Sequence, residues 1–269
     1  MNKNYEKIVS LVCNTLVEAG STFREDKKKA YKRAIASEDN EKAKWVLETV
    51  LANAEAAEKN HSPLCDDTGI PHIVLEIGPD AAVTGRMLDA IREGIAKGLR
   101  KLPGRPMGIM GDDCRRIDQS GGLNPDSAGV EPAPILIRRC QDNVIRLHIL
   151  MFGGGPAIRA KTYRVFHKHN MQVVLDEIVN WATEGVAQLG CSPCTLAVGV
   201  GRSHFEATSM MLQAQVDGRY DLQSEMEQEI TRRVNEANIG PLGLHGKTSV
   251  LATFMKAVSY THLRAHETT

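Results

Sequence analysis

Residues 189–203 read LGCSPCTLAVGVGRS, and this stretch decides the fold class. The apolar run TLAVGVG (195–201) predicts a strand, because it is short and is bounded by turn-forming residues. Apolar residues at helical spacing over 173–189 predict a helix before it, and another helix is expected to begin near Ser203. A strand between two helices is typical of an α/β or α+β fold.

Outward from this stretch, helical and strand patterns alternate along the chain. We expect mixed sheets flanked by helices, with an N-terminal helical region. The strands 135–137 and 144–152 are interpreted as a pair, and the region 102–134 has little periodicity, which is typical of a functional or mobile loop. The remaining helices are expected over 5–20, 24–44, 45–60, 81–100 and 223–238, and the remaining strands over 73–77 and 249–254.

The charge balance argues against a polyanionic partner. The chain has 33 Lys and Arg against 33 Asp and Glu, and aromatic residues make up only 4% of it. Nothing therefore indicates binding to nucleic acid or to an anionic membrane surface. The dense charge run at 24–44 mixes both signs, so it predicts a solvated helix with internal charge pairing rather than a binding patch.

No stretch approaches the roughly 18–20 apolar residues that cross a bilayer. The N-terminal apolar run is interrupted by Asn14 and Glu18 and follows helical spacing. It therefore predicts an amphipathic helix rather than a signal peptide. We expect a cytoplasmic protein.

The cysteines in loops are the first candidates for chemistry. In a cytoplasmic protein of this size a disulfide framework is not expected, and most single cysteines are small buried apolar residues. Cys65 stands in the loop CDDTG (65–69), where two carboxylates raise the pKa of the thiol. A bound metal would reverse this effect, because a coordinated thiolate is deprotonated. The alternative is an Asp-Thr-Gly turn with Cys65 buried beside it.

Cys191 and Cys194 form a C-x-x-C pair that is open to several interpretations. A zinc site needs two more ligands at matching spacing, and no second C-x-x-C occurs in the sequence. Redox C-x-x-C pairs usually begin a helix after a strand, whereas this pair precedes a strand. A cluster ligand supplied by one of the two fits better, because iron–sulfur clusters take thiolates from loops that are far apart in sequence.

Three consecutive glycines follow the strand 144–152. Gly153, Gly154 and Gly155 let the backbone approach a carboxylate or phosphate closely, although the three glycines alone favour a bulge or tight bend. Two other patterns are interpreted as structural, namely Gly199-x-Gly201, which lacks the third glycine of the dinucleotide motif, and Gly246-Lys247-Thr248. His167 and His169 are expected to be solvated, whereas His204 lies at a helix start that can attract an anion.

Four of these segments, in order and in register, resemble the alpha subunit or N-terminal part of class I fumarate hydratases and L(+)-tartrate dehydratases. They are PLCDDTG (63–69), FGGGPAIRAK (152–161), LGCSPCTLAVGVGR (189–202) and IGPLGLHGKTSV (239–250). The resemblance covers nearly the whole chain and implies a hydro-lyase that adds water reversibly to fumarate to give malate. The same resemblance leaves L(+)-tartrate dehydratase as the alternative activity.

The resemblance also implies a cofactor and the residues around it. The cofactor is a [4Fe-4S] cluster held by three cysteines, of which Cys65 and Cys191 match two. Cys194 matches no ligand, so Cys194→Ser is expected to be tolerated. By the same resemblance, Asp67 transfers a proton at the substrate carbon. The expected substrate contacts come from Asp66, which stands where the family commonly has glutamine, and from Arg105, Gly154 and Gly155.

Further groups are expected outside this sequence. One open iron and one arginine cannot hold both substrate carboxylates, and the resemblance places the other groups on a beta subunit, so a hetero-oligomer is expected. The third cluster cysteine of the family falls beyond GKTSV, and no cysteine follows Cys194. We therefore expect the alpha-type domain at 1–257 and a non-native tail at 258–269, and we expect this polypeptide alone to bind the cluster weakly or not at all.

Two rival functions remain open at this point. One is a cluster-free scaffold subunit, and the other is a zinc or thiol-redox protein that uses Cys191 and Cys194. The leading assignment requires that Cys65 and Cys191 meet over one centre, with Asp67 at the same cavity.

Overall fold

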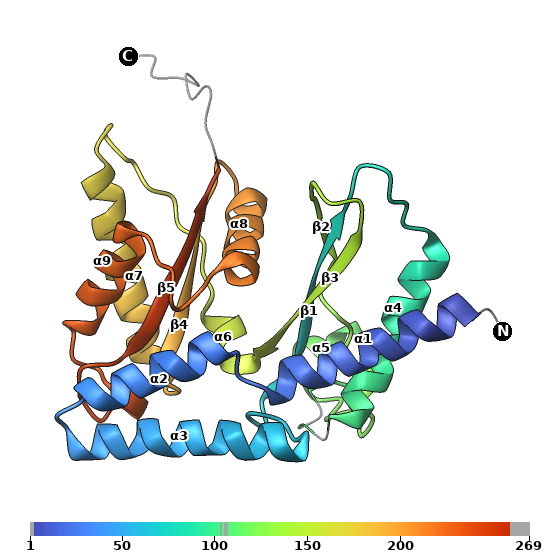
Figure 1. Ribbon diagram of the computed structural model, residues 1–269, viewed down its shortest axis with the longest axis horizontal. Helices are drawn as coiled ribbons and strands as arrows, with labels where there is room; N and C mark the ends of the chain where they lie inside the picture. The colour runs from blue at the N-terminus through green and yellow to red at the C-terminus, as the bar shows by residue number, and fades with distance from the viewer. Residues whose placement is uncertain (1–2, 103, 105–106, 259–269) are drawn as a thin grey trace.

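The computed structural model describes residues 3–258 except 103, 105 and 106. The chain forms two units, each with its own small sheet, and a long helix runs beneath both (Figure 1). The helices are α1 Lys3–Ser21, α2 Glu25–Ser37, α3 Glu41–Asn60, α4 Gly85–Lys101, α5 Asp113–Ile117, α6 Gly154–Arg159, α7 Met171–Leu189, α8 His204–Asp217 and α9 Glu225–Asn235. The strands are β1 Thr68–Ile77, β2 Leu136–Arg139, β3 Ile145–Gly153, β4 Cys194–Val200 and β5 Val250–Ala257. The expected class, mixed sheets flanked by helices after a helical N-terminus, is confirmed.

The first unit is a three-stranded mixed sheet in the order β2-β1-β3, packed against α1 and α4. Strand β1 is parallel to β2 and antiparallel to β3. Both strands of the predicted pair 135–137 and 144–152 therefore exist, but β1 lies between them. Gly94 lets α4 approach α1, because a Cβ there would lie 2.6 Å from the Val12 Cβ.

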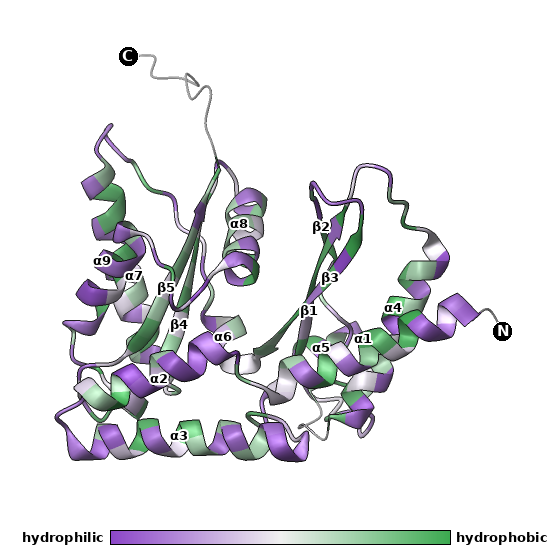
Figure 2. Ribbon diagram, in the orientation of Figure 1, coloured by the Kyte–Doolittle hydropathy of each residue, from purple (hydrophilic) through white to green (hydrophobic). Residues whose placement is uncertain are grey.

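The second unit is a parallel pair, β4 and β5, with α7 and α9 on one face and α8 on the other (Figure 1). Figure 2 shows these strands as largely apolar, whereas the covering helices alternate between apolar and polar residues. Gly199 has a packing role, because a Cβ there would lie 1.9 Å from the Ala207 carbonyl oxygen of α8. The structural interpretation of the Gly199-x-Gly201 pattern is thus confirmed.

Helix α3 is hydrogen-bonded to one loop of each unit. Its N-cap residue Asn40 accepts bonds from the backbone N–H groups of Lys42 and Ala43, and its side-chain amide donates to the Leu244 carbonyl of the second unit at 3.1 Å. Near the other end, the Asn53 amide donates to the Leu64 carbonyl of the first unit at 2.9 Å. An α-helix of 20 residues is about 30 Å long, so α3 sets the distance between these two loops.

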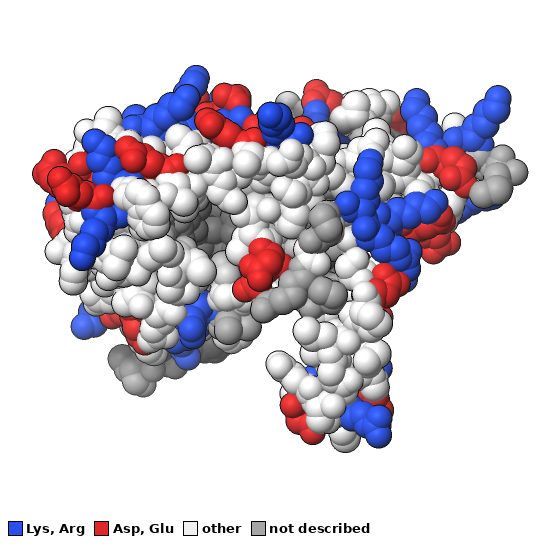
Figure 3. All heavy atoms as spheres, turned by 90° about the horizontal axis from the view of Figure 1, so that it is seen from below, with Lys and Arg blue, Asp and Glu red and all other residues white. Residues whose placement is uncertain are grey.

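The charge run 24–44 forms two helices instead of one, with a break between Ser37 and Glu41. Ala30, Tyr31 and Ala34 of α2 are buried, so one face of the run is core while the other is solvated. Figure 3 views the molecule from the α3 side and shows Lys and Arg beside Asp and Glu over much of that face. In the described part of the chain, every helix is too short or too polar to span a bilayer.

Candidate functional site

The first candidate loop, PLCDDTG, meets the glycine triplet at one end of the mixed sheet. Thr68, the first residue of β1, is the register partner of Gly153, the last residue of β3. A Cβ on Gly153 would lie 3.5 Å from the Asp67 carbonyl oxygen and 3.7 Å from the Asp67 Cβ. Two segments that are more than eighty positions apart in the sequence are therefore neighbours. Gly154 and Gly155 follow immediately as the first residues of the short helix α6.

Cys65 is exposed on this loop, beside the carboxylate of Asp66. Its thiol donates to Asp66 Oδ1 across 3.6 Å. Partial burial raises the pKa of the Cys65 thiol, and the neighbouring Asp66 and Asp67 carboxylates raise it further, whereas the Asp67 backbone N–H opposes them. The direction predicted for this thiol is thus confirmed, and the Cys65 side chain is not buried in the core.

Hydrogen bonds to the loop backbone hold it on both sides of Cys65. The Leu64 N–H donates to the Gly20 carbonyl at 2.9 Å, and the Leu64 carbonyl accepts the Asn53 amide of α3. The Thr68 N–H closes a turn onto the Cys65 carbonyl at 3.0 Å. The turn therefore spans Cys65 to Thr68, whereas the alternative placed it at Asp-Thr-Gly, where Thr68 and Gly69 instead begin β1. Cys65 is exposed rather than buried beside the turn.

Arg105, the arginine expected to contact substrate, lies outside the described residues. Its neighbour Gly104 is described, and a Cβ there would lie 3.1 Å from the Thr68 carbonyl oxygen. A Cβ on Gly154 would meet the end of the Met107 side chain at 3.1 Å. Gly104 thus lies beside the cysteine loop, and Met107 lies beside the glycine triplet.

Cys191 lies on the second candidate loop, which follows α7 and leads into β4. Gly190 ends α7 with a φ of 76°, a conformation that glycine adopts without strain. Ser192, which directly follows Cys191, is 4% exposed and donates its hydroxyl to the Gly240 carbonyl at 2.6 Å. In the opposite direction, the Leu242 N–H donates a hydrogen bond to the Ser192 carbonyl at 3.0 Å. The third and fourth matched segments are therefore locked to each other, and Cys191 remains exposed.

Cys194 differs from Cys191 in its surroundings. It is the first residue of β4, and burial raises the pKa of its thiol to about 12. The Cys194 thiol therefore stays protonated at neutral pH. The expectation that Cys194 is not a metal ligand stays a prediction.

A cleft of about 2800 Å³ runs between the two units and reaches both loops. Cys191 and Cys194 line it from the second unit, and Gly153, Pro156 and Leu64, which precedes Cys65, line it from the first. Within residues 3–258, leaving aside the three gaps, no group of three or more His, Cys, Asp or Glu side chains is arranged to hold a metal ion. Cys65 itself is not among the residues that line the cleft, although its neighbour Leu64 is. The convergence of Cys65, Cys191 and Asp67 on one centre stays a prediction.

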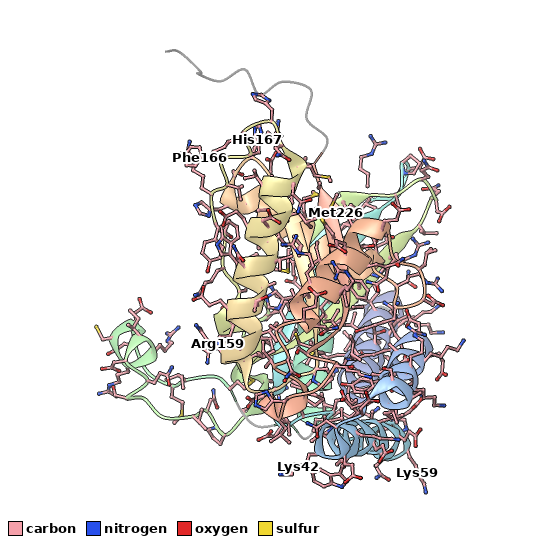
Figure 4. The ribbon with its side chains drawn as sticks, turned by 90° about the vertical axis from the view of Figure 1, so that its left-hand side faces the viewer. Lys42, Lys59, Arg159, Phe166, His167 and Met226 are labelled. Carbon is pink, nitrogen blue, oxygen red and sulfur yellow. The ribbon has the colours of Figure 1, made fainter. Side chains whose placement is uncertain are left out.

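The segment between α6 and α7 forms a basic edge of the cleft. Figure 4 shows Arg159 beside the lower part of α7, and Phe166 and His167 beside its upper end. Tyr163 fixes this segment, because its ring stacks on Trp181 of α7 with centroids 4.0 Å apart. His167 and His169 are exposed here, and their rings lie edge to face with centroids 5.1 Å apart.

Sequence reasoning missed one residue of the cleft, Lys27. It stands in the charge run that was interpreted as a solvated helix, yet its ammonium lies 3.9 Å from the centre of the Phe23 ring, inside the cleft. Phe23 precedes the N-cap residue Arg24, so this contact forms across the start of α2 and had no clear signal in the sequence.

Comparisons with known proteins agree with the paired segments. A protein named provisionally as an L(+)-tartrate dehydratase alpha subunit, from Methanocaldococcus jannaschii, is 26% identical over 260 residues, which is 93% of this chain and 88% of that protein. The L(+)-tartrate dehydratase alpha subunit of Escherichia coli K12 is 21% identical, over 94% of this chain and 83% of its own length. A provisionally named class I fumarate hydratase from Geobacillus stearothermophilus is 22% identical, and this chain spans 49% of it.

The family match covers most of the chain. The sequence model described as fumarate hydratase (fumerase) matches residues 9–264. This range runs past Ala257, and the division of the chain into 1–257 and a non-native tail stays a prediction. Because the match includes all four paired segments of both units, the chain belongs to the fumarate hydratase (fumerase) family.

Proposed function

We propose that this chain is the alpha-type subunit of an iron–sulfur hydro-lyase that adds water reversibly to fumarate to give malate. The observation that carries the proposal is the pairing of the four family segments around one cleft. Thr68 pairs with Gly153 on one side, and Ser192 binds Gly240 on the other. Family membership and the names of the relatives support hydro-lyase activity.

In this proposal Cys65 and Cys191 supply two of the thiolates of a [4Fe-4S] cluster. Both are free and exposed. When bound, such a cluster supplies a Lewis acid for the substrate's hydroxyl and carboxylate. The third thiolate is supplied from outside the described residues.

The chain's own residues are proposed to bind and orient the substrate and to move a proton. Asp67 is partly buried beside Gly153, and it takes or returns the proton at the substrate carbon. Gly154 and Gly155 offer backbone N–H groups to a carboxylate, and no atom lies within 4 Å of a Cβ placed on Gly155, so the backbone there is accessible. Asp66 and Arg105 are proposed to contact the substrate.

Two features support a partner subunit. Strand β4 lines the cleft along its whole length, and in the described residues it pairs with β5 alone, so one strand edge is left unpaired. The cleft of about 2800 Å³ is also larger than the roughly 300–1,000 Å³ of small-molecule sites. A beta subunit that inserts into the cleft would use this space and bring the remaining substrate-binding cations. The names of two relatives, which are alpha subunits, support this arrangement.

L(+)-tartrate dehydration is the second candidate activity, because two relatives carry that name. The test is to co-express this chain with a beta subunit of the same family, reconstitute the complex anaerobically with iron and sulfide, and assay both substrates. Loss of the fumarate absorbance together with malate formation is the expected result. Oxaloacetate formed from tartrate, with no reaction of fumarate, would replace the fumarate assignment by the tartrate one.

The scaffold and zinc or thiol-redox alternatives give different outcomes in the same assay. A scaffold chain leaves activity unchanged when Cys65→Ser replaces the wild-type chain in the complex. A zinc or redox protein loses activity with Cys194→Ser. The proposed hydro-lyase loses activity with Cys65→Ser, Cys191→Ser or Asp67→Asn and keeps it with Cys194→Ser.

A further inference from the structure

Lys27 places a poorly solvated cation inside the cleft. Its side chain, on α2, is partly buried, and its ammonium stacks on the Phe23 ring at 3.9 Å. Desolvation by burial and the nearby Arg24 guanidinium lower the pKa of Lys27 to about 8. An ammonium in such a place costs free energy unless an anion is held beside it.

The described residues supply no carboxylate to this ammonium. The adjacent Asp26 is bound by the Arg24 guanidinium at 3.0 Å and by the Tyr220 backbone N–H at 3.0 Å. Cys194 of the second unit lines the same cleft, but burial raises the pKa of its thiol to about 12, so it supplies no negative charge at neutral pH. Lys28, the next residue, is different, because it binds both Glu25 and Glu58. Lys27 therefore has an unfilled requirement for a counter-anion.

The lining of the cleft is enriched in cations as a whole. The Lys and Arg side chains that line it outnumber its Glu side chains seven to three, although the whole chain has no net charge. Two of those three, Glu25 and Glu58, already bind Lys28. A cleft lined mainly by one sign of charge concentrates small ions of the opposite sign.

We propose that Lys27 is the centre of a carboxylate-binding subsite in this cleft, which holds one carboxylate of a small dicarboxylate beside the Cys191 loop. The proposal rests on the proposed function for the identity of the dicarboxylate. The position of Lys27 supports it, because Lys27, Cys191 and Cys194 all line this cleft. Its role is to bind the carboxylate that is remote from the reacting carbon.

The direct test measures binding of succinate, an unreactive dicarboxylate, to the full chain without metal by calorimetry. Loss of one charge-assisted hydrogen bond is expected to weaken binding about 10- to 100-fold in Lys27→Met. The matched control is Lys29→Met, which removes an exposed lysine from the same helix and is expected to leave succinate binding unchanged. Unchanged affinity in Lys27→Met, or absence of succinate binding to the wild-type chain, overturns the proposal.

A second measurement separates binding from folding. Lys27→Met removes an unpaired charge and keeps the stem, so its melting temperature is expected to equal or exceed that of the wild-type chain. Reductive methylation with ¹³C-formaldehyde labels the lysines, and one dimethyl-lysine resonance should titrate near pH 8. This resonance should be absent from Lys27→Met. Its pKa should rise when succinate is added. Inorganic phosphate is the comparison anion, and a shift of equal size at equal concentration contradicts a carboxylate subsite.

The two proposals can fail separately. If the reconstituted complex hydrates fumarate while Lys27→Met leaves both succinate affinity and KM unchanged, the Lys27 subsite is wrong and the hydro-lyase stands. If Lys27→Met abolishes succinate binding while the complex shows no hydration or dehydration, the subsite stands and the hydro-lyase is wrong.

Discussion

Arg138 of β2 and Asp217, the last residue of α8, form a two-bond ion pair between the two units. Arg138 Nη1 lies 2.8 Å from Asp217 Oδ2, and Nη2 lies 2.6 Å from Oδ1. The same guanidinium donates Nε to Glu76 Oε1 of β1 at 2.8 Å. Lys256 of β5 binds Asp217 as well, at 2.6 Å. This network joins the mixed sheet to the β4–β5 unit, so it stabilises the arrangement of the cleft walls.

Glu76→Gln should destabilise the chain by about 3 kcal/mol, because it removes the buried carboxylate from an ion-pair network that includes the partly buried Arg138. The Glu76 side chain is only 8% exposed and lies between Arg138 and Arg146. Urea unfolding at neutral pH measures the change. Glu229→Gln is the matched control, since it removes an exposed helical partner of Arg232 and should have no measurable effect. Equal stability of Glu76→Gln and the wild-type chain would refute a structural role for the network.

The same network predicts loss of stability in acid. Burial raises the pKa of Glu76, but the hydrogen bonds from Arg146 and Arg138 outweigh it and leave the pKa lowered. In Asp217, bonds from Arg138 and Lys256 likewise outweigh burial and lower the pKa. A lowered carboxyl pKa in the folded state stabilises the protein at neutral pH, and the contribution is lost as the pH falls below about 4.

The stability difference between wild type and Glu76→Gln should therefore shrink as the pH is lowered from 7 through this range. Urea titrations at a series of pH values measure it. A difference that stays constant down to acid unfolding would contradict the assigned pKa directions.

Ser192→Ala should cost about 2 kcal/mol, because it leaves the buried Gly240 carbonyl without its hydroxyl donor. The substitution should also loosen the loop that carries Cys191 and lower iron uptake in reconstitution. Thr49→Val is the control, because it removes a hydroxyl that donates to a helix carbonyl at the surface. A Ser192→Ala chain with unchanged stability and unchanged iron uptake would show that this bond does not position Cys191.

Asn53→Ala should release the loop before Cys65, since the Asn53 side-chain amide donates a hydrogen bond to the Leu64 carbonyl. The expected cost is about 1 kcal/mol. Faster alkylation of Cys65, in a chain where the exposed Cys114 and Cys191 are replaced by Ser, is the local measurement. An alkylation rate equal to that of the same chain with Asn53 intact would exclude a positioning role for α3.

Most elements could be predicted because their signal is local. The strand expected at 195–201 is β4 (Cys194–Val200), and the helix expected at 173–189 is α7 (Met171–Leu189). Periodicity could not give the order of strands, so β1 was not expected between β2 and β3. Periodicity also could not show which apolar side chains of α3 face the core. Val46 and Leu47 are buried, whereas the neighbouring Trp45 is 64% exposed.

The site was predictable only in its separate parts. The thiols at Cys65 and Cys191 stand in loops with recognisable composition, and the raised pKa of Cys65 follows from its acidic neighbours. The pairing of segments depends on sheet register and on bonds such as Ser192 to Gly240, which carry no local sequence signal. Lys27 was missed for the same reason, because its desolvation comes from tertiary packing of the cleft.

The central claim is that Cys65 and Cys191 bind one iron–sulfur cluster. The most direct test is anaerobic reconstitution of the chain with iron, sulfide and excess 2-mercaptoethanol, which can supply the remaining thiolate, followed by iron and sulfide analysis. The wild-type and Cys194→Ser chains should take up a cluster, whereas Cys65→Ser and Cys191→Ser should each lose it. The same iron and sulfide content in a Cys65→Ser/Cys191→Ser double variant would contradict the claim.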